Sequence, residues 1–291
     1  MTEPQIFGEH EPKTLEQLRD VASRADRAAL MADGHLGYVM PIGGVAAYRR
    51  HVSVVGVGFD IACGNAAIRT DLTRAQLAPH LRGLADGIQD AISFGVGRKN
   101  LAGRYAYAGR EWVARKVVEL LGGREQELVH NHHNFAWREE HGGEPFYVVR
   151  KGATPAFPGQ KGFVGGSMGD DAVIIQGVAS NSAEVRDLQA RALYSTVHGA
   201  GRVMSRTAAA GKRTRRGKVT KPGAISREMM LEWVERKGVV LRGGGADESP
   251  HVYRRLPEVL AAQGPTVEAL HLLHPLVVVM AGAEEFDPYK D

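Results

Sequence analysis

The sequence predicts an α+β fold in a single domain that covers residues 1–291. Three observations favour this fold class. A length of 291 residues is enough for one large domain with a sizeable core. Segments with helical periodicity are mixed with segments rich in β-branched residues. The sequence shows no internal repeat and no long linker that would separate two domains.

Five segments have apolar residues at helical spacing. In the first, Thr14 and Gln17 have the spacing of a capping box. Ser182 and Ser226 are the expected N-caps of the last two, and Gly238 is the expected C-terminal stop. The five predicted helices cover residues 14–30, 74–92 (despite Pro79), 108–122, 182–196 and 226–238.

Strand-like segments lie between these helices. Residues 39–70 combine β-branched side chains with glycine at short intervals, which is typical of short strands joined by tight turns. Residues 145–150 and 172–177 have the composition of strands. Residues 275–282 are predicted to form a buried strand near the end of the chain.

The composition favours a cytoplasmic protein without a membrane segment. No apolar run approaches the length of a membrane span, and the first residues are polar, so we expect neither signal peptide nor anchor. The single cysteine cannot form an internal disulfide, which favours a reducing compartment. The net charge of +4 is mild, but residues 212–221 hold six cations and no acid. This run is either a solvated loop or a contact for nucleic-acid phosphates.

Glycine is abundant, at 36 residues, and gathers in short clusters. A glycine inside a helix or strand costs about 0.5–1 kcal/mol relative to alanine, so the clusters need a structural reason. Tight turns are one reason, and a backbone that approaches a ligand closely is the other. Backbone amides exposed by such loops can bind phosphate oxygens.

Asp60 and Cys63 form a D-x-x-C pair inside the stretch GVGFDIACG. In a turning segment the two side chains can converge, and a thiolate with a carboxylate suits a borderline metal such as Mn, Zn or Fe. A turn-forming aspartate beside a small buried thiol is the simpler explanation of an isolated pair.

A cluster of histidines follows, with His130, His132, His133 and His141 inside twelve residues. Neutral imidazole is the commonest metal ligand in proteins. Because neighbouring side chains on a helix point apart, only one of His132 and His133 is expected to face a metal. A structural role is the alternative for each histidine.

His198 stands directly before Gly199, Ala200, Gly201 and Arg202. The glycine amides can bind an anion beside the ring, and Arg202 adds a fixed positive charge. Such an imidazole can act as a base or as a nucleophile toward a phosphoryl group. A core histidine packed at a turn is the alternative. Combined with the metal-type ligands and the basic run, the pattern indicates metal-assisted phosphoryl chemistry.

Several long stretches resemble the RtcB family of RNA ligases. They occur in the order of the family between about residues 31 and 282: MADGHLGYVMPIGGVAA, GVGFDIACGNAAIR, HNHHNFAWREEH, RKGATPAF, GGSMG, STVHGAGRVMSR and DESPHVYRRLPEVL. The resemblance implies a compact α+β domain whose β-sheets surround a deep cleft for metal and nucleotide.

The resemblance also implies an activity. Family members join an RNA end with a 3′-phosphate or 2′,3′-cyclic phosphate to an end with a 5′-hydroxyl, using GTP and Mn²⁺, in RNA repair or tRNA splicing. By this resemblance, His198 attacks the α-phosphorus of GTP and becomes a guanylyl-histidine. The guanylyl group passes to the RNA 3′-phosphate, and the 5′-hydroxyl then displaces GMP.

The family pattern assigns site residues by position. By resemblance, Asp60, Cys63 and His133 are manganese ligands. The implied nucleotide contacts are His133 and Asn134, the loop of Gly165, Gly166, Ser167 and Met168, the guanylylation motif of His198, Gly199, Ala200 and Gly201, and Tyr253, which matches an aromatic that packs on guanine.

The sequence departs from the family pattern after the cysteine motif. The family carries a G-N-H-F-x-E motif and a further ligand histidine there, but no histidine lies between His80 and His130. We therefore predict an internal deletion joined near Asn100 and Leu101, which removes two metal ligands and two groups that hold GTP. In addition, Met280 stands where the family has a lysine that reads guanine.

Three functions remain open at this level. The first is an active GTP- and Mn-dependent RNA ligase, which the family motifs favour. The second is a relative that binds RNA ends or nucleotide without turnover, which the deletion favours. The third is a metal-dependent phosphohydrolase, supported only by the ligand set. We expect RNA and GTP as partners and no membrane.

Overall fold

The computed structural model describes residues 3–58, 60–92, 104–213 and 219–282. Helices and strands are mixed along these ranges, which confirms the mixed α and β composition expected from the sequence. The predicted join near residues 100 and 101 lies outside the described residues, as does the centre of the basic run.

The largest sheet has five strands in the order β1-β2-β3-β7-β6. They are β1 (Gln5–Ile6), β2 (Arg27–His35), β3 (Ile42–Tyr48), β7 (Glu144–Lys151) and β6 (Asn134–His141). β1 pairs with β2 in parallel, and the remaining pairs are antiparallel. Helix α1 (Pro12–Ala22) packs on one face, where Leu18 meets Ala28 and Leu30.

The other strands form one three-stranded sheet and four pairs. The three-stranded sheet consists of β15 (Val267–Leu273), β10 (Ala172–Gly177) and β9 (Lys161–Val164). The pairs are β4 (Gly64–Thr70) with β5 (Glu125–His132), β8 (Ala153–Pro155) with β11 (Ser195–Val197), β12 (Gly211–Arg213) with β13 (Val219–Pro222), and β14 (Val240–Gly244) with β16 (Val277–Gly282).

The remaining elements are helices. The α-helices are α2 (Val54–Val57), α3 (Arg74–Leu77), α4 (Leu81–Ala91), α5 (Arg104–Leu121), α6 (Ala183–Arg191), α7 (Arg206–Ala210), α8 (Arg227–Arg236) and α9 (Leu256–Gln263). Four short 3₁₀ turns are η1 (Ala78–His80), η2 (Ala246–Glu248), η3 (Pro250–Val252) and η4 (Gly264–Thr266). No helix in the described ranges is both long enough and apolar enough to cross a bilayer.

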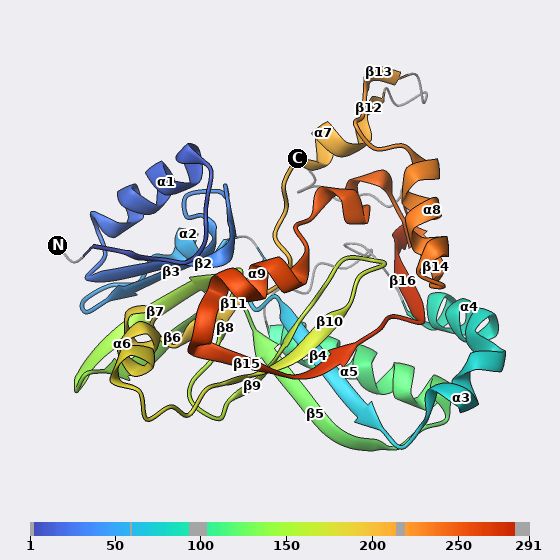
Figure 1. The fold of residues 1–291 in the computed structure, drawn as a ribbon, viewed down its shortest axis with the longest axis horizontal. Helices are drawn as coiled ribbons and strands as arrows, with labels where there is room; N and C mark the ends of the chain where they lie inside the picture. The colour runs from blue at the N-terminus through green and yellow to red at the C-terminus, as the bar shows by residue number, and fades with distance from the viewer. Residues whose placement is uncertain (1–2, 59, 93–103, 214–218, 283–291) are drawn as a thin grey trace.

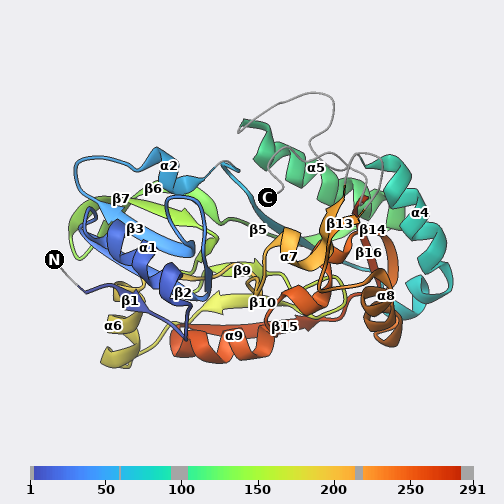
Figure 2. The same ribbon diagram turned by 90° about the horizontal axis from the view of Figure 1, so that it is seen from above.

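Strands β4, β5, β9 and β10 connect two ends of the molecule. In Figure 1 the five-stranded sheet with α1 lies on the left and helices α4 and α8 lie on the right, with these strands between them. Seen from above in Figure 2, α9 and β15 run along one long side and α5 lies along the other. The main core includes Val45, Val148, Val197 and Val259, so it joins the large sheet to β11 and α9.

The predicted helix caps are partly confirmed. The hydroxyls of Ser182 and Ser226 each accept a hydrogen bond from the backbone amide three residues later, at the starts of α6 and α8. The capping box at Thr14 is wrong, because α1 begins at Pro12 and its N-cap makes no side-chain hydrogen bond. The Gln17 side chain instead donates to the carbonyl of Gly37, at 2.7 Å.

Three predicted boundaries are also wrong. The first predicted helix ends at Ala22, and its last four residues, 27–30, belong to β2, which is buried along nearly its whole length. The segment 74–92 is divided into α3, η1 and α4, since Pro79 has no amide proton to continue the helical bonds. The segment 182–196 ends its helix at Arg191 and enters β11. Strand β16 is half-buried, not buried as predicted.

Candidate active site

A cavity of about 330 Å³ opens where several strands and loops end. Most of the residues predicted to contact nucleotide line it, although they come from four separate parts of the sequence. These lining residues are His133, Gly165, Gly166, Ser167, Met168, His198, Gly199, Ala200, Gly201 and Tyr253. Asn134, Asp60 and Cys63 do not line the cavity.

His198 follows the end of β11 and is held by Asp33 of β2. Its Nδ1 lies 2.6 Å from Asp33 Oδ2. The same oxygen accepts hydrogen bonds from the backbone amides of His198, at 3.0 Å, and Gly199, at 3.2 Å. Because this oxygen already acts as an acceptor twice, Nδ1 is the donor in the third bond. This tautomer leaves the lone pair of the imidazole on Nε2.

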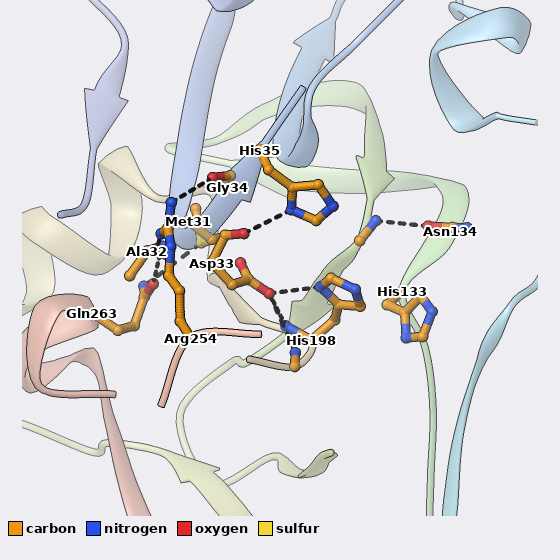
Figure 3. Close-up of polar contacts among 12 residues, drawn as sticks. Met31, Ala32, Asp33, Gly34, His35, His133, Asn134, His198, Arg254 and Gln263 are labelled. Carbon is orange, nitrogen blue, oxygen red and sulfur yellow. Dashed lines mark hydrogen bonds and ion pairs between the residues drawn. The ribbon is translucent and has the colours of Figure 1, made fainter. Parts of the chain in front are cut away.

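Asp33 is fully buried, and its strand is held in place from the other side. Arg254 donates to the carbonyls of Ala32, at 2.5 Å, and Gly34, at 3.2 Å. The Gln263 amide oxygen accepts a hydrogen bond from the backbone amide of Ala32, at 3.1 Å. Figure 3 shows these contacts beside the Asp33–His198 pair. The carboxylate is therefore fixed in position before any ligand binds.

Gly201 allows the loop after His198 to cross β2 closely. Its φ of +72° is in the left-handed region, and a Cβ at this position would lie 2.4 Å from the carbonyl oxygen of Asp33. A side chain would push the loop away from β2 and disturb the contact between Asp33 and His198. The glycine is needed here for close approach to β2, whereas the sequence suggested tight turns or close approach to a ligand as the reasons for its glycine clusters.

His133 connects the cavity to Cys63. Its Nε2 lies 3.2 Å from the Cys63 Sγ, and its ring is 4.8 Å from the ring of His198 in an edge-on arrangement. Burial holds the pKa of His133 well below its ordinary value, so the imidazole is neutral. Burial, the charge of Asp60 and a hydrogen bond with Asp60 raise the pKa of the Cys63 thiol to about 12.

The predicted metal ligands fit a metal only in part. Two donors on one tetrahedral ion are about 3.6 Å apart, from metal–nitrogen and metal–sulfur distances of about 2.1 and 2.3 Å. The separation of 3.2 Å between Cys63 and His133 is close to this value. Asp60, however, is exposed, and no group of three metal-type side chains assembles within the described residues. Cys63 and His133 therefore fit a metal as a pair, and the three-ligand set stays a prediction.

Asn134 makes hydrogen bonds that hold the backbone around Cys63. Its side-chain oxygen accepts from the amide of Gly152, at 2.6 Å, and its side-chain nitrogen donates to the carbonyl of Asp60, at 3.2 Å. These bonds tie the Asp60–Cys63 turn to the end of β7. Its predicted contact with nucleotide stays a prediction.

The loop of Gly165 to Met168 is held from outside the cavity. Ser167 Oγ donates to Asp170 Oδ2, at 2.7 Å, and Arg255 Nη1 donates to the same oxygen, at 2.6 Å. Arg255 also donates to the carbonyl of Tyr253, at 3.0 Å. The loop and Tyr253 are therefore linked by one carboxylate and one guanidinium.

Tyr253 and Arg202 form one wall of the cavity. Arg202 donates to the Tyr253 hydroxyl, at 2.9 Å, and its guanidinium lies 5.1 Å from the centre of the tyrosine ring. The Tyr253 hydroxyl donates to Glu248, and burial, with the charge of Glu248, raises the pKa of the phenol. Arg206 pairs with Glu248 as well. This wall combines an aromatic ring with two cations, and both cations are paired with Glu248.

Several lining residues carried no role in the sequence prediction. The sequence did not single out Asp33, which makes a hydrogen bond to His198. It also did not single out the lining residues Asn65, Arg206 and Glu248. Asp33 had a usable signal, because it stands inside the apolar run AALMADGH, and a buried carboxylate needs a hydrogen-bonding partner. Asn65 shows no such signal. Its side chain donates to the carbonyl of Phe163, at 3.1 Å, across elements that lie far apart in the sequence.

The motifs lining this cavity match a known family. The model of the family described as tRNA-splicing ligase RtcB matches residues 15–104 and 97–281, which together are most of the chain. This chain belongs to the RtcB family. The two matches meet at residues 97–104, the region where the sequence predicts a deletion.

Characterised relatives carry RtcB names. RNA-splicing ligase RtcB of Escherichia coli strain K12 is 31% identical over 167 residues, which cover 57% of this chain and 36% of that protein. tRNA-splicing ligase RtcB of Thermococcus kodakarensis is 41% identical over 93 residues, covering 30% of this chain and 19% of that protein. RNA-splicing ligase RtcB homolog 2 of Entamoeba dispar is 45% identical over 76 residues, covering 24% and 14%. The chain thus spans about a third or less of the length of these relatives.

Proposed function

We propose that this chain is an RNA ligase that uses GTP to guanylylate His198 and then joins RNA ends. His198 Nε2 attacks the α-phosphorus of GTP, a nitrogen–phosphorus bond forms, and pyrophosphate leaves. The guanylyl group passes to an RNA 3′-phosphate, which restores the histidine. An RNA 5′-hydroxyl then attacks the activated phosphate, and GMP leaves with the bonding electrons. A 2′,3′-cyclic phosphate end first takes up water to give the 3′-phosphate.

The observation that carries this proposal is the Asp33–His198 pair at the cavity. The Nδ1 hydrogen bond of 2.6 Å fixes the ring and directs the lone pair to Nε2, which is the arrangement of an activated histidine nucleophile. When Nε2 bonds to phosphorus, the ring becomes positively charged. The Asp33 carboxylate then stabilises that charge from the opposite side of the ring.

The surroundings of His198 support a phosphate ligand. The loop of Gly165 to Met168 and the segment of Gly199 to Gly201 line the cavity on either side of the nucleophile. Backbone amides of such loops can bind phosphate oxygens. Arg202 and Arg206 also line the cavity, and although both are paired with Glu248, their remaining N–H donors would stabilise the negative charge of the leaving pyrophosphate.

Cys63 and His133 would hold the divalent metal ion, beside the nucleophile. A metal there supplies positive charge that neutralises the phosphate being transferred. The Cys63 thiol must lose its proton for this role, because its pKa is about 12 in the free protein. The remaining coordination positions would be filled by water or phosphate oxygens.

A labelling experiment tests the first step. The purified chain is incubated with GTP labelled at the α-phosphate, with and without Mn²⁺, and the label that stays on denatured protein is measured. We expect an acid-labile label on the wild type and none on His198→Ala. His274→Ala is the matched control, because that histidine is exposed and does not line the cavity. A folded wild type that takes up no label would contradict the proposal.

The second candidate is a relative that binds RNA ends or nucleotide without turnover. The absence of a three-donor metal group in the described part of the chain favours it, as does Met280 in the cavity lining where the family pattern has lysine. It predicts RNA binding that survives His198→Ala, with no label in the wild type. A phosphohydrolase would instead release phosphate with metal and without GTP.

A further inference from the structure

We propose that a row of rings outside the cavity, formed by Tyr107, His130, His132 and Phe135, binds single-stranded RNA by stacking on its bases. The proposal rests on the proposed function, since it gives the RNA a second contact away from the reacting phosphate. This surface, called the ring row below, lies where α5 meets β5 and the start of β6.

The rings of the row contact one another in sequence. Tyr107 stacks on His130 with ring centres 4.0 Å apart and planes 29° apart, and it lies 5.3 Å from His132. His132 then stacks with Phe135, with centres 5.5 Å apart and planes 22° apart. Tyr107 is 45% exposed and Phe135 is 36% exposed, so both ends of the row present ring surface to solvent.

The ring row lies on the face of β5 opposite the cavity. Successive side chains of a strand point to opposite faces. His133, just beyond the end of β5, lines the cavity, and Asn131 accepts from the amide of Phe163 on the same side, at 3.0 Å. His130 and His132 therefore point away from the cavity, toward α5. An RNA strand bound to the ring row would pass the turn of residues 60–63 to reach the cavity.

Arg110 supplies the positive charge of this surface. It donates to His130 Nε2, at 2.6 Å, to His132 Nδ1, at 2.9 Å, and to the carbonyl of Ala62, at 2.9 Å. All three acceptors are uncharged, and within the described residues Arg110 forms no ion pair with a carboxylate. A guanidinium has five N–H donors, so two remain for another acceptor. A nucleic-acid phosphate suits them in charge and geometry.

The combination of groups favours RNA over a protein partner. Burial, and then the charge of Arg110, lowers the pKa of His130 to about 4. The row thus consists of stacked rings, with no carboxylate among them, beside the Arg110 cation. Surfaces that bind single strands without sequence preference combine aromatic rings for the bases with cations for the backbone. Packing of α5 accounts for the Arg110 bonds, but it does not require exposed ring surface at both ends of the row.

Fluorescence anisotropy with a labelled RNA tests the ring row. The probe is a 12-nucleotide unstructured RNA with a 3′-phosphate, added to the full chain without GTP. Tyr107→Leu and Phe135→Leu keep apolar bulk and remove the ring, so each should raise Kd by about 5- to 150-fold, the factor expected for one lost base stack. Tyr107→Phe keeps the ring and should keep the affinity. Each variant is compared with the wild type by thermal unfolding.

Trp112→Leu is the matched control. Trp112 is 56% exposed on the same helix and makes none of the row's ring contacts, so its loss should leave Kd within about twofold of the wild type. A duplex of the same sequence, whose bases are already stacked, should bind all variants equally. Unchanged affinity in both leucine variants, as a protein-binding surface would give, or an equal loss in Trp112→Leu, overturns the proposal.

The outcome is independent of the guanylylation test. Label on His198 is measured without RNA, and RNA affinity is measured without GTP. If the label fails and the ring row effect is present, the proposed ligation is wrong and the RNA surface stands. If the label forms and the leucine variants bind normally, the ring row is wrong and the nucleophile stands.

Discussion

Asp33→Asn separates the charge of the carboxylate from its shape. In the buried environment of Asp33, the amide oxygen can take the position of Oδ2 and still accept the three hydrogen bonds, at 2.6, 3.0 and 3.2 Å. The imidazole tautomer and the loop position are then kept. The negative charge that stabilises the guanylyl-imidazolium is lost.

The size of the effect follows from the short contact. Two unit charges about 4 Å apart interact by about 4 kcal/mol at an effective dielectric constant of about 20. The carboxylate already attracts the neutral imidazole through its hydrogen bond before the reaction, so only part of this energy is specific to the transition state. We therefore expect the variant to lose about 2–4 kcal/mol of transition-state stabilisation, which is a rate decrease of about 30- to 1,000-fold. The structural cost is of similar size, since three charged hydrogen bonds become neutral at roughly 1 kcal/mol each, so the rate has to be measured on folded protein.

The assay is the initial rate of acid-labile label on His198 at saturating GTP and Mn²⁺, normalised to folded protein. Asp33→Ala serves as comparison, because it leaves two backbone amides and Nδ1 without their acceptor and should also lower the thermal midpoint clearly. A folded Asp33→Asn chain that labels within about threefold of the wild type would refute the role assigned to this carboxylate.

Three single positions give further predictions. Gly201→Ala should lower the free energy of unfolding by at least about 1 kcal/mol in a denaturant titration. The cause is the φ of +72° and the added Cβ, which would lie 2.4 Å from the carbonyl oxygen of Asp33. A variant as stable as the wild type would contradict this. Burial lowers the pKa of His35 to about 4, so the unfolded chain binds the extra proton between about pH 4 and 6.5. His35 should therefore account for roughly 1–3 kcal/mol of the stability that the wild type loses as the pH falls through this window. His35→Gln should lose that much less over the same range. Met280→Lys, which places a cation in the cavity lining, should tighten GTP binding by about 10- to 100-fold by calorimetry.

Much of the fold was predictable because its signals are local. Ser182 and Ser226 cap their helices as expected, and residues 172–177 form the predicted strand. Strand β2 was misread as the continuation of a helix. Its residues are buried on both faces, so it lacks the alternation of apolar and polar residues that identifies an ordinary strand. Periodicity cannot separate such a strand from a buried helix.

In the site, too, short motifs could be predicted from the sequence, while contacts between distant segments could not. The motif that follows β11 and the loop of Gly165 to Met168 are short stretches, and the fold brings both to one cavity. The partner of His198 is 165 positions away, and nothing in the histidine motif points to it. Its position depends on the pairing of strands and on the bonds that Arg254 makes to β2. A sequence motif thus points to the proposed nucleophile, while the group that orients it depends on tertiary structure.

The proposed metal ligands show why the lining of the cavity alone does not determine whether the chain is an active ligase. Cys63 and His133 meet because Cys63 O accepts a hydrogen bond from the His133 amide, at 2.9 Å, next to the β4–β5 pair. That backbone contact positions these two donors together with the bonds that Asn134 makes to Gly152 and Asp60. Asp60 is the third donor that the sequence predicts, and the predicted deletion near residues 100 and 101 lies outside the described residues. The backbone therefore holds the proposed nucleophile and two of the proposed donors, and we expect the strength of metal binding to depend on how far Asp60 turns toward them.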